Sequence, residues 1–396
     1  MSESADKAQP IAETRSLLDE LIRTLETGGP QQRLRILQRV SDMFMAGARG
    51  YSNEQIALFD DVLQQLSCEI ESKVRARLAQ RMAGIDRAPP GLIRALAFDD
   101  EIAVAGPVLV RSNQLSDADL VENARTKSQA HLLAIAQRLQ LSEAVTDVLV
   151  ERGDRRVARQ VARNRGARFS LAGYGKLTTR ARHDRKLTLA LGSRSDLPRQ
   201  CFLKLVEAAS ASVRARLEAS HPDYAEMIGE TVDELATRLQ QETRALSKEH
   251  AAAERKAQRR FRTSPVTDAH VHAPAHAQEF ERVAISLARL GQFPLDLVER
   301  ALLDSGEDML LILAKAAGCS WTTARELLQM QSAGRSLGAD DLRRCAEQYR
   351  KLKLETAKNI LRFREERIRM RSQGFENAGA SGMHAADDFL PLAATA

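Results

Sequence analysis

Apolar residues recur along most of this chain at steps of three and four, the spacing that gives a helix one apolar stripe. One such series precedes Gly50 and consists of Leu34, Leu37, Val40 and Phe44. No segment shows a sustained alternation of apolar and polar residues bounded by hairpin turns, which would predict strands. The pattern therefore predicts an all-α chain built from short, closely spaced helices.

Short helices at this density cannot each bury an apolar stripe alone, so we expect them to pack as repeats. Residues 147–170 and 300–321 share a plan of helix, turn and second helix, and residues 95–116 form a looser copy. The matching positions are Leu149 and Leu302, Gly153 and Gly306, Val157 and Leu310, and Val161 and Ala314. We interpret this plan as a HEAT-like α-solenoid, in which each helix pair buries the face that its neighbour leaves open.

The segment from Pro222 to about Arg262 differs, because it has no Gly after Gly229 and no further Pro. Its apolar residues follow the spacing of a coiled-coil seam: Ile228, Val232, Leu235, Leu239 and Leu246. Such a long helix needs a partner. The candidates are a second long helix from Asp340 to about Arg371, a second copy of the chain, and the helix's own solenoid.

The final residues are rich in Gly, Ala and Ser and lack periodicity, which predicts a disordered tail. We therefore expect six regions along the chain. They are a disordered N-terminus over 1–12, a HEAT-like repeat domain over 13–221, a long helix over 222–263, a linker over 264–278, a smaller C-terminal helical domain over 279–372 and the tail over 373–396.

The composition is that of a globular protein, with 43% hydrophobic and 28% charged residues. The formal net charge of +6 is small for 396 residues, so only its local distribution can indicate an acidic or nucleic-acid partner. Four scattered cysteines without a CxxC pair predict reduced thiols in the cytoplasm. The longest apolar stretches, "IAVAGPVLV" and "MLLILA", fall far short of the ~20 residues that span a bilayer, so we expect a cytoplasmic protein without a membrane partner.

Two stretches resemble a known family. They begin "LFDDVLQQLSCEIESKVRARLAQ" (Leu58 to Val121) and "HLLAIAQRLQLSEAVTDVLVERGDRRVARQ" (His131 to Ser170). Both are similar to an uncharacterised family of alphaproteobacterial proteins known as a domain of unknown function. The likeness covers roughly the first 210 residues and extends more loosely over the rest. It implies helical repeats and a bacterial cytoplasm, and it brings no activity and no functional residues to this chain.

The stretch "TDAHVHAPAH" places His270 and His272 at alternate positions, as in the first strand of a metal-dependent amidohydrolase barrel. Such a site needs strands and further ligands, and the only histidine after His276 is His384. We therefore interpret the stretch as a linker and expect no metal and no cofactor, although three nearby imidazoles could bind Zn²⁺ adventitiously. A metal-dependent hydrolase is kept as an alternative.

Other enzyme signatures are absent from the sequence, including GxxxxGK[ST], GxSxG, HExxH and a strand-borne GxGxxG. An all-helical chain with none of these motifs predicts a protein that is not an enzyme.

The strongest local signal is positive charge. Between Glu151 and Lys186 lie twelve basic residues and three acidic ones, a surplus of nine that exceeds the net charge of the whole chain. On the helix that follows Asp154, Val157 and Val161 are expected to face inward. The outward side carries the candidate binding residues, which are Arg152, Arg155, Arg156, Arg159 and Arg163. The simpler alternative is a solvated helix face neutralised by neighbouring repeats.

Arginine forks bind carboxylates and phosphates alike, so the partner class depends on other features. Aromatic residues make up only 4% of the chain, which lacks the stacking platforms of a single-strand binder. We expect a non-catalytic protein interaction scaffold whose partner presents an acidic surface, with a possible homodimer through the long helices. The alternative is binding to a nucleic-acid duplex backbone through the basic helix.

Overall fold

A computed structural model describes residues 30–68, 70–262, 265–304, 306–332 and 338–363. Every regular element within these ranges is a helix, which confirms the all-α prediction. The disordered ends predicted over 1–12 and 373–396 lie outside the described residues. No helix among the described residues combines the length and the apolar character needed to cross a bilayer.

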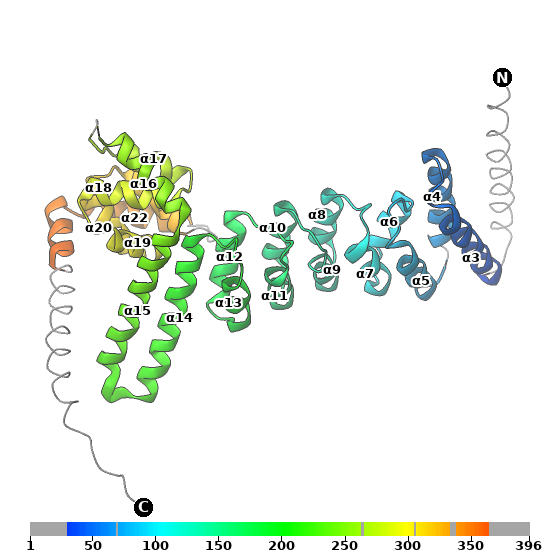
Figure 1. The fold of residues 1–396 in the computed structure, drawn as a ribbon, viewed down its shortest axis with the longest axis horizontal. Coiled ribbons are helices and arrows are strands. Elements are labelled where there is room, and N and C mark those ends of the chain that lie inside the picture. The colour runs from blue at the N-terminus through cyan, green and yellow to red at the C-terminus, as the bar shows by residue number, and fades with distance from the viewer. Residues whose placement is uncertain (1–29, 69, 263–264, 305, 333–337, 364–396) are drawn as a thin grey trace, which may run out of the picture. The chain divides into compact units, whose positions relative to one another are not determined.

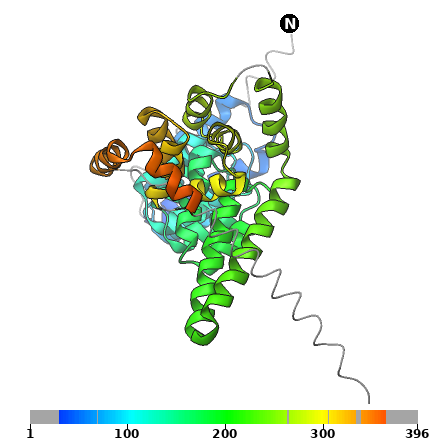
Figure 2. The same cartoon turned by 90° about the vertical axis from the view of Figure 1, so that its left-hand side faces the viewer.

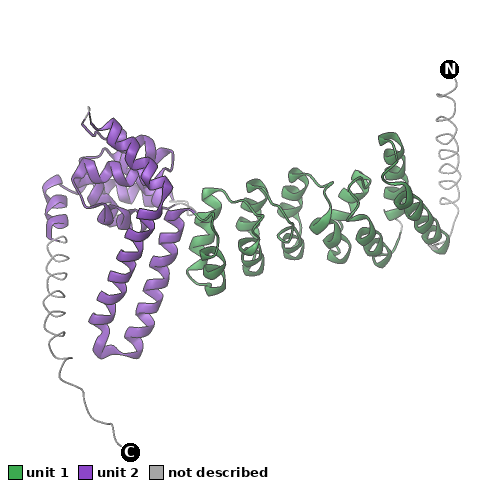
Figure 3. Ribbon diagram, viewed as in Figure 1, with its two compact units in different colours: residues 1–197 green, residues 198–396 purple. Residues whose placement is uncertain are grey.

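The chain forms two compact units, residues 1–197 and 198–396 (Figure 3). The sequence predicts a boundary at 221, whereas the compact units divide at 197. The reason is α14 (Arg199–Ser220), whose partner is α15 (Ala225–Leu246) of the second unit.

The first unit is a row of short helices (Figure 1). They are α3 (Pro30–Gly47), α4 (Asn53–Cys68), α5 (Ser72–Met82), α6 (Pro90–Ala97), α7 (Ile102–Arg111), α8 (Asp117–Thr126), α9 (Gln129–Ile135), α10 (Glu143–Arg152), α11 (Arg155–Arg163), α12 (Leu171–Ala181) and α13 (Arg185–Gly192). Successive pairs pack on each other: α8, α10 and α12 form one layer, and α5, α7, α9, α11 and α13 form the other. The helix pair predicted around Leu149 is α10 and α11, while its HEAT-like assignment stays a prediction.

Neighbouring helix pairs are joined by polar side chains that reach back to the carbonyl end of a helix in the previous pair. The last four carbonyls of any helix lack partners within that helix, so they accept such bonds readily. Arg138 donates to Leu109 O and Ser112 O at 2.7 and 2.8 Å, and Arg180 donates to Val150 O and Gly153 O at 2.8 and 2.7 Å. These links fix the spacing of the stack in addition to the apolar core.

The second unit begins with a long antiparallel hairpin, α14 and α15, joined by the 3-10 turn η1 (Pro222–Tyr224) (Figures 1 and 2). It continues with α16 (Lys248–Arg260), α17 (Ala269–His276), α18 (Phe280–Gly291), α19 (Leu295–Leu303), α20 (Glu307–Ala316), α21 (Trp321–Gln331), α22 (Ala339–Lys351) and a helix over 354–363. The second copy of the predicted repeat corresponds to α19 and α20, where Leu302 and Leu310 are both buried.

Two elements of the second unit differ from the prediction. The single long helix expected over 222–263 is two helices, because Ser247 leaves the helical conformation and caps α16 through a bond from His250 N. The linker expected over 264–278 contains α17. A helix is possible there because its only proline, Pro274, removes a single backbone hydrogen bond from an otherwise well-packed element.

Candidate functional site

The arginine-rich helix α11 has the orientation that the sequence predicts. Val157, Ala158, Val161 and Ala162 are buried against neighbouring helices. Arg155, Arg156 and Arg163 are exposed on the opposite side, and Arg159 is half-buried. The assignment of these arginines as binding residues stays a prediction.

Two of the five candidate arginines are engaged in linking helix pairs. Arg152 donates to the carbonyl of Ala124 at the end of α8. Arg159 Nε donates to both carboxylate oxygens of Asp184, at 2.8 and 3.0 Å, and Asp184 caps the start of α13. Burial raises the pKa of Asp184, but the bonds from Arg159 and from backbone amides outweigh it and hold that pKa below its ordinary value. These two arginines therefore stabilise the stack.

The remaining three arginines lie at opposite ends of α11. Arg156 borders a shallow hollow of about 340 Å³ beside Ile102 and Gln129. Arg163 borders a larger hollow of about 1130 Å³ at the other end of the helix, which we call the loop groove. The loop groove is lined by Asp117, Gln140, Leu141, Ser142, Glu143, Ala162, Arg163, Arg165, Gly166, Ala167, Arg168, Ser193, Arg194, Ser195 and Asp196. The predicted patch is therefore two separate surfaces.

The rim of the loop groove is fixed by backbone hydrogen bonds between two loops. Leu141 N donates to Gly166 O at 3.1 Å, and Arg168 N donates to Leu141 O at 2.9 Å, so the loops meet as a short parallel bridge. Gly166 is required at this contact, since a Cβ there would collide with the carbonyl oxygen of Leu139. The exposed arginines Arg165 and Arg168 therefore stand on a rigid support.

Arg194 forms the floor of the loop groove. Its guanidinium donates to Asn164 O at 2.6 Å and to Ala167 O at 2.8 Å, pairs with Asp196 at 2.7 Å, and lies over the ring of Phe169. Its side chain is only 5% exposed, so it positions the loop and is not available to a ligand.

The loop groove carries charged side chains of both signs. Arg163, Arg165 and Arg168 are exposed on α11 and the loop that follows it. Asp117 and Glu143, at the starts of α8 and α10, and Asp196, which pairs with Arg194, line the groove as well. Arg165 and Arg168 belong to the basic run but not to the predicted binding residues, because nothing in the periodicity of α11 extends to the loop that follows it.

The histidine stretch does not converge on a common point. His270 accepts from Thr267 N at 3.0 Å and packs against Phe261, while His276 lies 3.1 Å from a carboxylate oxygen of Glu326. His270 and His272 sit on the helix α17, where alternate residues point in different directions. The strand-like ligand arrangement of an amidohydrolase is therefore not formed.

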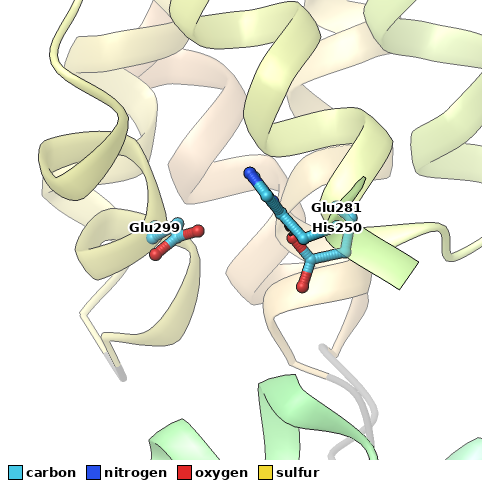
Figure 4. Close-up of side chains that lie close together, drawn as sticks. All are labelled: His250, Glu281 and Glu299. Carbon is cyan, nitrogen blue, oxygen red and sulfur yellow. Dashed lines mark hydrogen bonds and ion pairs between the residues drawn. The ribbon is translucent and has the colours of Figure 1, made fainter. Parts of the chain in front are cut away.

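A different set of ligand-type side chains does converge. His250, Glu281 and Glu299 are buried in the second unit with their ligand atoms within 4.8 Å of one another (Figure 4). His250 Nδ1 lies 2.7 Å from Glu281 Oε2. No local sequence pattern indicates this cluster, since its members come from three separate helices, α16, α18 and α19.

Two arginines donate hydrogen bonds to the carboxylates of this cluster. Arg199 Nη1 donates to Glu281 and Glu299 at 2.9 and 3.0 Å, and Arg244 Nη2 donates to Glu299 at 2.8 Å. Burial raises the pKa of Glu299, but these bonds outweigh it and hold that pKa below its ordinary value. A metal ion would have to displace Arg199 and leave a buried cation without a counter-charge, which is costly. We therefore assign the cluster to an ion-pair network that joins α14, α15, α16, α18 and α19.

The fold and these surfaces define an all-α protein made of stacked helix pairs and a hairpin-bearing helical unit. The chain belongs to the family described as "Uncharacterised protein conserved in bacteria" (DUF2336), whose model matches residues 104–362. The match includes the stretch from His131 to Ser170 that carried the resemblance, whereas most of the stretch from Leu58 to Val121 precedes it. No curated protein and no solved structure matches the chain.

Proposed function

We propose that this protein is a non-catalytic interaction scaffold whose loop groove binds a segment of a partner protein that carries acidic side chains. The observation that supports this most directly is the rigid placement of Arg165 and Arg168 on loops held by backbone bonds and by Arg194. Preformed sites bind with less loss of conformational entropy than mobile ones. The proposal includes the cytoplasmic location that the scattered cysteines predict.

The mixed charges of the loop groove favour a protein segment over a nucleic acid. A phosphate backbone is uniformly negative, so it would meet repulsion from Asp117 and Glu143 in the groove. A peptide can place acidic side chains opposite the arginines and basic or neutral ones opposite these carboxylates.

A non-catalytic role is supported by the ion-pair network. The cluster of His250, Glu281 and Glu299 uses its carboxylates to hold Arg199 and His250. These groups tie helices together and are closed off from solvent.

The test compares two pairs of charge reversals on the same unit. Arg165→Glu with Arg168→Glu alters the loop groove, and Arg182→Glu with Arg185→Glu places the same charge change at exposed positions around the turn between α12 and α13. Proteins retained from nuclease-treated lysate of the native bacterium should be lost with the first pair and kept with the second. Equal retention by both pairs would reject the groove as the binding site.

The second candidate function is binding of a nucleic-acid duplex, which the exposed Arg155 and Arg156 favour. It predicts that the wild-type chain binds short duplex DNA and that the affinity falls steeply with salt. It also predicts that Arg155→Glu with Arg156→Glu weakens this binding more than the groove pair does.

A further inference from the structure

The hairpin of α14 and α15 exposes an unusual concentration of apolar side chains. Near the base, Cys201, Leu203 and Leu205 are buried. Further out the two helices contact little except each other, and only Gly229 and Gln240 of α15 are buried. The large apolar residues left exposed on the hairpin are Val213, Leu217, Tyr224, Met227, Leu235, Leu239 and Leu246.

Most of these side chains lie on one face of the hairpin. The two helices meet where Arg214 approaches Gly229. An α-helix turns by about 100° per residue, so Val213 and Leu217 project from the same flank of α14 relative to that contact. Leu235 and Leu239 likewise project from one flank of α15. Because the helices are antiparallel, these two flanks are on the same side of the hairpin. We call this side the apolar face.

The opposite side of the hairpin is used within the unit. Thr237 on this side accepts a hydrogen bond from Arg300 of α19, and Arg244 pairs with Asp296 and Glu299. The hairpin thus packs on α19 with this side and leaves Val213, Leu217, Leu235 and Leu239 of the apolar face exposed. This is the reverse of the usual orientation of an amphipathic helix in a monomer.

We propose that the apolar face pairs with the same face of a second copy of this chain, which gives a four-helix bundle at the centre of a homodimer. The seam of Ile228, Val232, Leu235 and Leu239 has the heptad spacing that such packing requires. A face about 33 Å long and about 20 Å wide buries on the order of 1,300 Å² over two copies, which lies in the range of specific interfaces.

A second copy fits this face better than a different protein does. In a two-fold pair each apolar stripe meets an identical stripe, so the surface is complementary to itself without any further feature. The charge of Arg214, where the two helices meet, is paired within the hairpin, with Glu218 at 2.7 Å and with Asp233 at 3.4 Å. The proposal does not depend on the loop groove and can fail or succeed separately from it.

The experiment measures the mass of the full-length chain by light scattering after size exclusion, at micromolar concentration. The wild type should have twice the monomer mass of 43.8 kDa. Val213→Glu with Leu217→Glu should reduce the mass to that of a monomer. Ala215→Glu with Ala219→Glu adds the same charges to exposed positions on the opposite flank of α14, and this control should remain dimeric.

Circular dichroism of each variant shows whether the helices persist, and Leu235→Gln with Leu239→Gln tests the same face from α15 with a milder change. The proposal is overturned if the wild type is a monomer, if both face variants remain dimeric, or if the control pair also dissociates. A wild-type monomer that binds anionic lipid vesicles through this face would assign it to a membrane surface instead.

Discussion

The two units of this protein hold their helices together by different means. In the first unit, Arg138 and Arg180 reach back 26 and 27 residues to the carbonyls that end a helix of the preceding pair. In the second unit, Arg199 joins Glu281 and Glu299, which lie 82 and 100 residues away. The first unit is therefore linked by contacts that are short in sequence and repeated. The second unit has such contacts too, as from Gln331 to Ala301 O and Gly306 O, and adds a buried ion-pair network that joins segments much farther apart.

This difference has consequences for stability. A carbonyl that loses one cationic donor at the edge of a stack can bind water instead, so the loss of stability stays local. A buried carboxylate that loses its arginine, or an arginine that loses its carboxylate, is left as an uncompensated charge. We therefore expect the second unit to be the more sensitive to a single substitution.

The largest expected effect is that of Glu299→Ala. The substitution leaves Arg199 and Arg244 without their shared partner, and the loss of one member of a buried pair costs about 3–5 kcal/mol. Chemical unfolding should show this loss, and hydrogen exchange should place it in α14, α15 and α19. Glu242→Ala, at an exposed position of α15, should change the free energy of unfolding by less than about 0.5 kcal/mol. Equal effects of the two substitutions would contradict a central role for the network.

A smaller effect is expected for Arg194→Ala in the first unit. This removes bonds to Asn164 O and Ala167 O together with the contact to Phe169, for a cost of about 2 kcal/mol. Hydrogen exchange should increase in residues 162–168 and remain unchanged in the second unit. Arg182→Ala, at an exposed position, is the matched control. Increased exchange throughout the chain would contradict the local nature of these links.

The stability of the second unit is expected to depend on pH through the carboxylate of Glu299. The pKa of Glu299 is lower in the folded protein than its ordinary value, so its contribution to stability is present above the unfolded pKa and is lost as the pH falls through the folded pKa. The difference in unfolding free energy between wild type and Glu299→Gln should be largest near neutrality and should shrink as the pH falls below the ordinary pKa of a glutamate, about 4.3. A difference that grows in acid would mean that the carboxylate is not the stabilising form.

The smallest effect on stability is expected for Arg155→Ala with Arg156→Ala. Both side chains are exposed, and the apolar contacts of Val157 and Val161 remain. The free energy of unfolding should change by less than about 0.5 kcal/mol. A larger loss in chemical unfolding would show that these arginines, like Arg152 and Arg159, hold the stack together.

The helical class, the inward side of α11 and the helix pair around Leu149 could be predicted because they depend on residues close in sequence. Periodicity reports burial, and Val157 and Val161 are buried as expected. The division of the long helix at Ser247 could not be predicted in this way, since Ser is tolerated within helices and the break is stabilised by its bond to His250 N. The unit boundary at 197 depends on the pairing of α14 with α15, which periodicity does not report.

The candidate site was predicted only in part. The basic run contains Arg163, Arg165 and Arg168 of the loop groove, but the sequence could not show that Arg152 and Arg159 are engaged by Ala124 O and Asp184. Nor could it show that Arg165 and Arg168 lie on bridged loops, because the bridging hydrogen bonds join Leu141 to Gly166 and Arg168, which lie 25 and 27 residues away. The network around Glu299 is built entirely from long-range contacts, which no local pattern records.

The binding of defined anionic probes to the full-length chain tests the proposed function most directly. The probes are a labelled glutamate-rich peptide and a labelled DNA duplex, with fluorescence anisotropy as the readout at matched salt. We expect the peptide to bind in preference to the duplex, and we expect Arg165→Glu with Arg168→Glu to weaken it at least tenfold, about 1.4 kcal/mol, while Arg182→Glu with Arg185→Glu leaves it unchanged. Preferential, strongly salt-dependent binding of the duplex, or equal weakening by both pairs, would contradict the loop groove as a site for an acidic protein segment.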